Sequence, residues 1–220
     1  MKAKVTIPTE LKDIKLSQFQ KYLKVTEGSE DVNFINRTAV GIFCNLSDEQ
    51  VNAIKAKDFD FIVNTINETL NKQSELVSRF TLDGIEYGFI PDIENITLGE
   101  KIDIDNNIND WQKMDKMMGV CYRPINYKHK NTYLIDEYTG EEKALDVTLD
   151  VAIGCMVFFY DLMKDLVNFI PNFIEAHLED NPKALQILEK NGGNIKTFTQ
   201  SLEVIFSDLM TLQNLNYIKH

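Results

Sequence analysis

The sequence predicts a mainly α-helical α+β fold, with a helical-bundle core, one small β-hairpin and extended N-terminal and middle arms. Three observations lead to this prediction: apolar residues recur at helical spacing through most of the chain, one Asp-Gly pair lies between alternating residues, and an Ile-Pro pair followed by an Ile-x-Leu step occurs twice. With 220 residues, 44% hydrophobic and 26% charged, and with prolines and glycines scattered, the chain predicts one structural domain spanning 1–220.

The repeated phrase is Ile7-Pro8 and Ile90-Pro91, and each copy leads to an Ile-x-Leu step and a polar stretch typical of a helix start. Proline disfavours helix at the residue before it and offers no amide N–H to a sheet. We therefore predict an extended arm at 1–16 and a second arm, after a hairpin, within 80–104. The simpler alternative is two ordinary strand-to-helix junctions that share turn residues.

The N-terminal third of the chain predicts consecutive helices. Residues 16–23 have helical spacing, and a second helix is expected around 32–43. The run Ser47-Asp48-Glu49-Gln50 is a capping box, which should open a helix reaching about Lys55. Asp58 should cap a further helix whose apolar residues share one face: Phe59, Ile62, Val63, Ile66 and Leu70.

The middle of the chain changes pattern. Alternating residues around Asp83-Gly84 predict a β-hairpin over 80–89, because this dipeptide tolerates the positive φ angles of a two-residue turn. A helix over 108–118 should carry the single tryptophan, with Asp103 and Asp105 as solvent-facing caps. Residues 121–142 predict a long irregular loop, and loops of that length are usually functional or ordered by a partner.

The C-terminal part, 146–213, predicts the helical core. A helix over 147–170 is apolar except for a narrow polar stripe, so we expect it at the centre of the core. The last helix repeats apolar residues at spacings of three and four, including Phe198 and Leu202. This seam favours packing within the bundle, with docking of another subunit as the alternative.

Candidate chemistry is sparse. The three histidines stand apart from cysteines and paired carboxylates, and the run beginning at Asp103 lacks the glycine and final glutamate of a calcium loop. Asp161 and Asp165 share a helix face, but Lys164 beside them favours a solvated stripe over an acid/base pair. No phosphate-binding loop or nucleophile elbow is present in the sequence. We therefore expect no enzyme activity, cofactor, metal or small-molecule substrate.

Charge and cysteines limit the partners further. The net charge of −11 argues against duplex DNA as the principal ligand, because phosphate binding requires a positive surface. A local basic segment favours contact with an acidic neighbouring subunit, with phosphate as the alternative; its residues are Tyr122, Arg123, Lys128, His129 and Lys130. Cys44, Cys121 and Cys155 predict buried thiols in a reducing compartment, and the longest apolar run, 151–160, is too short to span a bilayer.

Several phrases are similar to those of small virion proteins of tailed phages. Among these proteins, the phrases resemble most closely the neck and tail ring proteins of crAss-like phages of gut Bacteroidales. The phrases are Val5-Thr6-Ile7-Pro8, Asp13 through Leu23, Ile96 through Asp103, and Tyr122-Arg123-Pro124-Ile125. The resemblance implies a structural subunit, assembled in the host cytoplasm into the virion, that forms a homo-oligomeric ring on the portal axis between capsid and tail. It implies portal and other neck or tail proteins as partners, and no active site.

The residues themselves agree with such a role. Proline-bearing arms can reach neighbours by strand addition, a ring needs different patches that meet, and acidic side chains facing a channel would repel passing DNA. The expected partner-binding residues are Ile7, Pro8, the basic segment, Phe198 and Leu202. The main alternative is an acidic, non-enzymatic adaptor or assembly chaperone that binds virion proteins.

Overall fold

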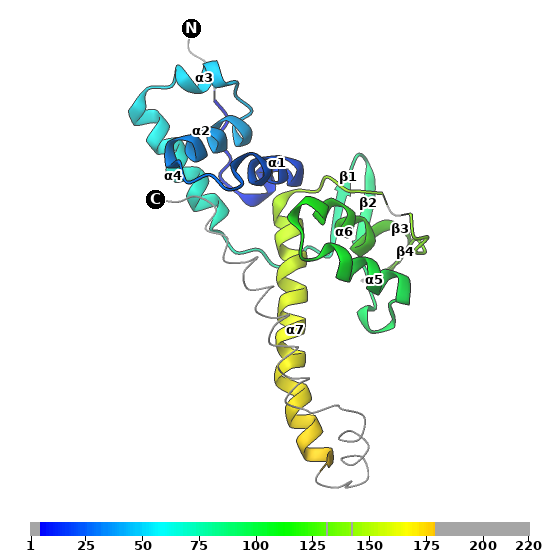
Figure 1. Cartoon of the computed structure of the whole chain (residues 1–220). Coiled ribbons are helices and arrows are strands. Elements are labelled where there is room, and N and C mark those ends of the chain that lie inside the picture. The colour runs from blue at the N-terminus through cyan, green and yellow to red at the C-terminus, as the bar shows by residue number, and fades with distance from the viewer. Residues whose placement is uncertain (1–4, 131, 142, 179–220) are drawn as a thin grey trace. The chain divides into compact units, whose positions relative to one another are not determined.

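The computed structural model describes residues 5–130, 132–141 and 143–178. Within these residues lie seven α-helices, three short 3-10 helices and one four-stranded antiparallel sheet, which confirms the α+β prediction (Figure 1). The chain divides into two compact units, and the division falls between Cys155 and Met156. The sheet and the first six α-helices belong to the first unit.

Four helices follow one another at the N-terminus: α1 (Leu16–Thr26), α2 (Val32–Phe43), α3 (Asp48–Asn52) and α4 (Ala56–Leu70). The capping box at the start of α3 is confirmed, since Ser47 Oγ accepts from the Gln50 amide and Gln50 Oε1 accepts from the Ser47 amide. The α3 helix is shorter than expected, ending at Asn52. The predicted apolar face of α4 is confirmed by the burial of Ile62, Val63, Ile66 and Leu70.

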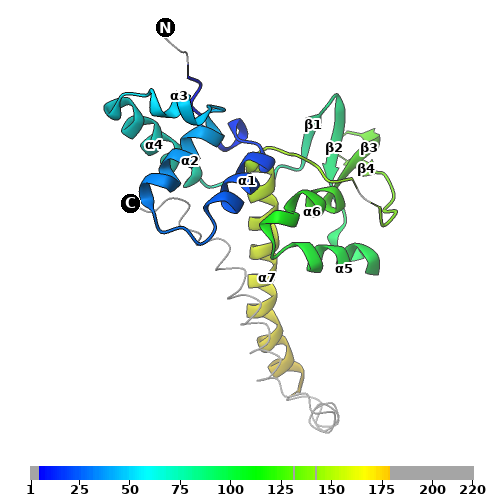
Figure 2. The ribbon, with the colours of Figure 1, turned by 45° about the horizontal axis from the view of Figure 1, so that its top comes forward.

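Helices α5 (Leu98–Asn107) and α6 (Met114–Cys121) complete the first unit's helical layer. The helices pack in the order α4 on α2, α2 on α1, α1 on α6 and α6 on α5, so α4 and α5 are the two ends of this series (Figures 1 and 2). The Phe19 ring of α1 packs edge to face on the Trp111 ring, with 4.9 Å between the ring centroids. This contact joins the N-terminal helices to the segment that leads into α6.

The sheet has the strand order β1 (Arg79–Leu82), β2 (Ile85–Phe89), β3 (Tyr122–His129), β4 (Thr132–Ile135). The predicted hairpin is confirmed: β1 and β2 pair antiparallel around Asp83 (φ 52°) and Gly84 (φ 80°), as a two-residue turn requires. Alternate residues of β1, β2 and β3 form one aromatic face, in which Phe80 contacts both Tyr87 and Tyr122.

The predicted irregular loop at 121–142 is wrong for most of its length, because 122–129 and 132–135 form β3 and β4. Pro124 sits in β3 opposite Tyr87, although a proline has no N–H to donate to a sheet. The Asp136 amide donates to the Pro124 carbonyl at 3.0 Å, and the Asp136 carbonyl accepts from Arg123 Nε at 2.8 Å. The arginine side chain thus supplies a donor beside the position where proline has no N–H.

The two predicted arms are held by their own chain in the described residues. Ile14 and Leu16 are fully buried, the Leu149 amide donates to the Ile14 carbonyl, and the Leu16 amide donates to the Val147 carbonyl, both at 2.8 Å. The second phrase also folds inward, since the Ile90 amide donates to the Cys121 carbonyl at 2.9 Å. Both expected arms therefore pack against their own chain in the described residues, and both phrases lead into helices, α1 and α5.

The segment expected as one helix over 108–118 is a 3-10 turn, Trp111–Lys113, followed by α6. Asp110 caps it, because its carboxylate accepts from the Gln112 amide at 2.9 Å. Asp103 and Asp105 lie inside α5 instead. Sequence reasoning placed the caps too early because it did not extend the helix that starts at Leu98 through this acidic run.

The predicted C-terminal core helix is present as α7 (Leu149–Leu178), longer than the expected 147–170. Its first turns bury Leu149, Val151, Ala152 and Cys155 within the first unit. The rest of the predicted core after residue 178, including Phe198 and Leu202, lies outside the described residues.

Asp146 provides a test of how the N-terminal segment is held. Its carboxylate accepts from Ser17 N at 2.8 Å and Ser17 Oγ at 3.0 Å, capping α1 from 129 residues away, whereas the N-cap residue Lys15 makes no side-chain cap bond. We expect Asp146→Ala to lower the free energy of unfolding by about 1 kcal/mol, as measured by urea denaturation. The matched control Asp105→Ala, which removes an exposed ion pair with Lys101, should change it by less than about 0.5 kcal/mol.

Candidate functional site

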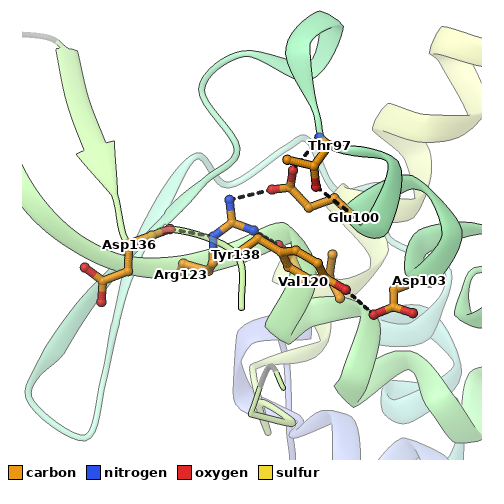
Figure 3. A network of polar contacts seen from close by, with 7 residues as sticks. All are labelled: Thr97, Glu100, Asp103, Val120, Arg123, Asp136 and Tyr138. Carbon is orange, nitrogen blue, oxygen red and sulfur yellow. Dashed lines mark hydrogen bonds and ion pairs between the residues drawn. The ribbon is translucent and has the colours of Figure 1, made fainter. Parts of the chain in front are cut away.

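A cavity of about 440 Å³ lies where four segments meet: the second Ile-Pro phrase, the start of α5, the start of β3 and the end of β4. It is lined by residues 90–92, 95–97 and 134–138, together with Glu100 and Arg123. Figure 3 shows a network of polar contacts in its wall, which includes the lining residues Thr97, Glu100, Arg123, Asp136 and Tyr138. We call it the Arg123 cavity.

Glu100 is placed in this wall by a sequence pattern that starts α5. Thr97 and Glu100 form a capping box at the start of α5: Glu100 Oε2 accepts from the Thr97 amide at 2.6 Å, and Thr97 Oγ1 accepts from the Glu100 amide at 3.2 Å. A capping-box glutamate is usually solvated, but Glu100 is only 4% exposed. Its second oxygen therefore needs a buried donor.

Arg123 is that donor. Its Nη2 lies 2.7 Å from Glu100 Oε1, while Nη1 donates to the Val120 carbonyl at 2.9 Å and Nε to the Asp136 carbonyl at 2.8 Å (Figure 3). The residue is only 6% exposed. One guanidinium thus connects α5, the end of α6 and the end of β4, which makes the pair a structural centre of this part of the fold.

Tyr138 closes the centre from one side. Its hydroxyl donates to the Asp103 carboxylate, and the Arg123 guanidinium carbon lies 5.9 Å from its ring centroid (Figure 3). Gly99 provides the space for this ring, because a Cβ there would come within 2.8 Å of Tyr138 Cε1. The segment after β4 is thereby held against α5.

The cavity is acidic at its rim. Glu100 and Arg123 neutralise each other in the wall, which leaves Asp92, Asp136 and Glu137 as the remaining charged lining residues, all exposed. Asp92 accepts from Asn95 and Asp136 from Asn126, both neutral donors, so these bonds do not cancel the negative charge. A cationic or mixed cationic and apolar group fits this lining best.

The exposed part of the predicted basic segment lies at the end of β4 that is farther from the Arg123 cavity. We call Lys128, His129 and Lys130 the basic turn. Lys128 and His129 are the last residues of β3, and Lys130, which has a φ of 54°, follows in the turn. Lys128 pairs with Glu86 of β2. Among the described residues Lys130 forms no ion pair, so its ammonium is available to a partner.

A second, apolar groove of about 470 Å³ lies at the α4 end of the first unit. The N-terminal residues Val5 and Ile7 line one side, and α4 contributes Phe61, which is 65% exposed. Pro8 lies beneath the surface, where its carbonyl accepts from Thr69 Oγ1 at 3.2 Å. Of the two arm residues expected to bind partners, Ile7 is thus placed at a surface groove and Pro8 is not.

The structure separates the other expected partner residues in the same way. Tyr122 and Arg123 are buried and serve the interior, whereas the basic turn is exposed. Glu100 was not among the expected site residues, although the Thr97-x-x-Glu100 capping pattern was readable. Only the tertiary fold, which brings Glu100 to Arg123, reveals that the same carboxylate also forms a buried ion pair.

No group of three or more His, Cys, Asp or Glu side chains in the described part of the chain is arranged to hold a metal ion. The three cysteines are buried as predicted, and burial raises the pKa of Cys44 to about 11. Over the same residues, no helix combines the length and apolar character that crossing a membrane requires.

Glu100 should make stability depend on pH. Burial raises the pKa of its carboxyl, but hydrogen bonds from Thr97 and the Arg123 guanidinium outweigh burial and bring the pKa below its ordinary value. Such a group contributes stability that is complete above the unfolded-state pKa, about 4.3, and is lost as pH falls through the lower folded-state pKa.

We therefore expect the stability advantage of the wild type over Glu100→Gln to shrink once the pH falls below about 4.3, as measured by urea denaturation in steps from neutral pH downwards. A difference that stays constant through this range would contradict the assignment of a lowered pKa to Glu100.

Comparison of the chain with protein-family models, with curated proteins and with solved structures gave no match. Three surfaces of the described residues are suited to bind a partner: the acid-rimmed Arg123 cavity, the basic turn and the apolar groove at the α4 end.

Proposed function

We propose that the chain is a non-enzymatic structural subunit of a tailed-phage virion, which joins an oligomeric ring at the portal, neck or tail through which DNA passes. The observation that carries the proposal is the placement of exposed apolar side chains at both ends of the helix series. Leu98 and Ile102 of α5 are 73% and 48% exposed, and Phe61 of α4 is 65% exposed beside the apolar groove.

Exposed apolar surface of this kind is typical of contact sites, and a subunit held between different partners needs at least two of them. Leu98 and Ile102 are four residues apart and share one face of α5, so they present a continuous stripe. The resemblance of the N-terminal and middle phrases to phage neck and tail ring proteins supports the same role. The acidic balance of −11 suits a subunit beside a DNA channel, because it repels phosphate.

The test is the native mass of the purified full-length chain, alone and mixed with the portal and neck proteins of the same genome. We expect a discrete ring, or a monomer that enters a ring only with these proteins. Leu98→Lys should weaken binding to them without changing the urea unfolding midpoint, whereas Lys101→Ala on the same helix should leave binding intact.

A second candidate is an acidic adaptor or assembly chaperone that binds virion proteins and then leaves, which the same apolar surfaces and net charge would also serve. The two functions differ in the finished particle. A chain that binds neck proteins during assembly but is missing from purified virions by mass spectrometry is a chaperone. A stable monomer or dimer that ignores these proteins contradicts the ring function.

A further inference from the structure

We propose that the basic turn of one copy docks into the Arg123 cavity of the next copy, and that this is the copy-to-copy contact of the ring. The inference rests on the proposed function, and it names which surfaces of the subunit meet. It leaves the apolar ends at α4 and α5 for the other partners.

The cavity is suited to a lysine side chain. Its volume of about 440 Å³ is open to solvent between the apolar residues Ile90, Ile96 and Leu134 and the acidic rim. A lysine can lay its methylene stem along the apolar residues while its ammonium reaches the carboxylates. The buried Glu100–Arg123 pair keeps the wall rigid, so little ordering is needed when a partner enters.

The basic turn is suited to enter it. Lys130 lies at the tip of a two-strand hairpin and forms no ion pair with any described residue, and Tyr127, three residues before it in the chain, is 57% exposed. An exposed tyrosine provides a large apolar contact area with a polar end. The hairpin is held firmly from behind, since Tyr133 of β4 donates to the Phe89 carbonyl at 2.8 Å.

A second copy is the occupant that the charges favour. The chain carries 34 acidic against 23 basic residues, so most of its surface repels an acidic rim, and Lys128-His129-Lys130 is its one run of three consecutive basic residues. The turn and the cavity lie at opposite ends of β4, roughly 13 Å apart at the rise of a strand, so a copy's own turn is held away from its own cavity. Contact between two different patches is the head-to-tail arrangement that closes into rings.

The experiment exchanges charge between the two surfaces of the full-length protein. Lys130→Glu makes the turn acidic, and Glu137→Lys makes the rim less acidic; both side chains are exposed. Each variant alone should assemble at least about tenfold more weakly than the wild type in sedimentation velocity at low salt, with the portal and neck proteins present if the wild type needs them to form a ring. A 1:1 mixture should restore association, because the altered turn then meets the altered cavity. Lys57→Glu, an exposed α4 residue with the same change in net charge, should behave as the wild type.

Two results would overturn the docking proposal while the ring function stands. In the first, the wild type assembles with the portal and neck proteins, and both charge variants assemble equally well. In the second, the 1:1 mixture of the variants associates as weakly as each variant alone. A Lys130→Glu variant that self-associates normally but no longer shifts a single-stranded oligonucleotide would assign the turn to phosphate instead. Wild type that neither self-associates nor binds the portal and neck proteins removes the ring function itself.

Discussion

Replacing Arg123 with alanine is expected to lower the free energy of unfolding by about 3–5 kcal/mol, a large part of the stability of a domain of this size. The variant leaves Glu100 as a buried, unpaired carboxylate and removes the donors to the carbonyls of Val120 and Asp136. The Glu100 carboxylate and the Val120 carbonyl accept in buried bonds and keep their desolvation cost, whereas the bond to the Asp136 carbonyl is only partly buried. Urea denaturation at neutral pH measures the loss.

The double variant Glu100→Gln/Arg123→Ala separates the buried charge from the other losses. It should recover part of the stability, because a neutral amide is less costly to bury than a charge, and the single Glu100→Gln variant completes the mutant cycle. Lys101→Ala, which breaks an exposed ion pair with Asp105 on the same helix, should cost less than about 0.5 kcal/mol. A loss below about 1 kcal/mol for Arg123→Ala would show that the pair is not a structural centre.

Gly154→Ala is the second large effect we expect, with a loss of about 1–3 kcal/mol or more. Alanine normally stabilises a helix over glycine, but a Cβ at Gly154 of α7 would lie 2.2 Å from the Glu75 carbonyl oxygen and 3.3 Å from the Leu76 Cα. These are backbone atoms, so a rotamer change cannot relieve the clash. The connecting segment near Glu75 is also fixed, since Ser74 Oγ donates to the Asp150 carbonyl at 2.9 Å.

Gly41→Ala is the matched control for this variant. Gly41 lies in α2, and a Cβ there would meet the Leu46 carbonyl oxygen at 3.5 Å and Val51 Cγ2 at 3.7 Å, which are ordinary contacts. We therefore expect Gly41→Ala to raise the free energy of unfolding by up to about 1 kcal/mol, the opposite sign from Gly154→Ala. Thermal and urea unfolding of both variants give the comparison, and the same sign for both would refute the close approach at Gly154.

These two sites differ in how far the sequence could lead to them. The Thr97-x-x-Glu100 capping pattern is local, since both bonds join residues three apart. The Glu100–Arg123 pair spans 23 residues, and its existence depends on how β3 leaves α6 and passes α5. Gly154 carries no local signal, because its neighbour Glu75 lies 79 positions away and the close approach arises only when α7 packs on the segment before β1.

The main error about the fold concerns β3, which contains Pro124. The missing N–H of a proline is a local property that disfavours a strand. The strand forms nevertheless because Arg123 Nε donates to the Asp136 carbonyl and because the Tyr133 ring packs on Gly88, where a Cβ would lie 2.4 Å from it. The first contact joins β3 to the residue that follows β4, and the second joins β4 to β2, so neither can be read from a window around the proline.

By itself, the sequence determined the features whose energy comes from neighbours along the chain: the capping boxes at Ser47 and Thr97, the turn at Asp83-Gly84, the apolar face of α4 and the helix starts after both Ile-Pro phrases. Tertiary structure alone decided what those features touch. It turned the expected N-terminal arm inward onto residues 147–149, buried Tyr122 and Arg123, and left the basic turn at the surface. The reason is physical: caps and turns satisfy backbone groups a few residues away, whereas burial and pairing of side chains depend on segments that meet only when the whole chain has folded.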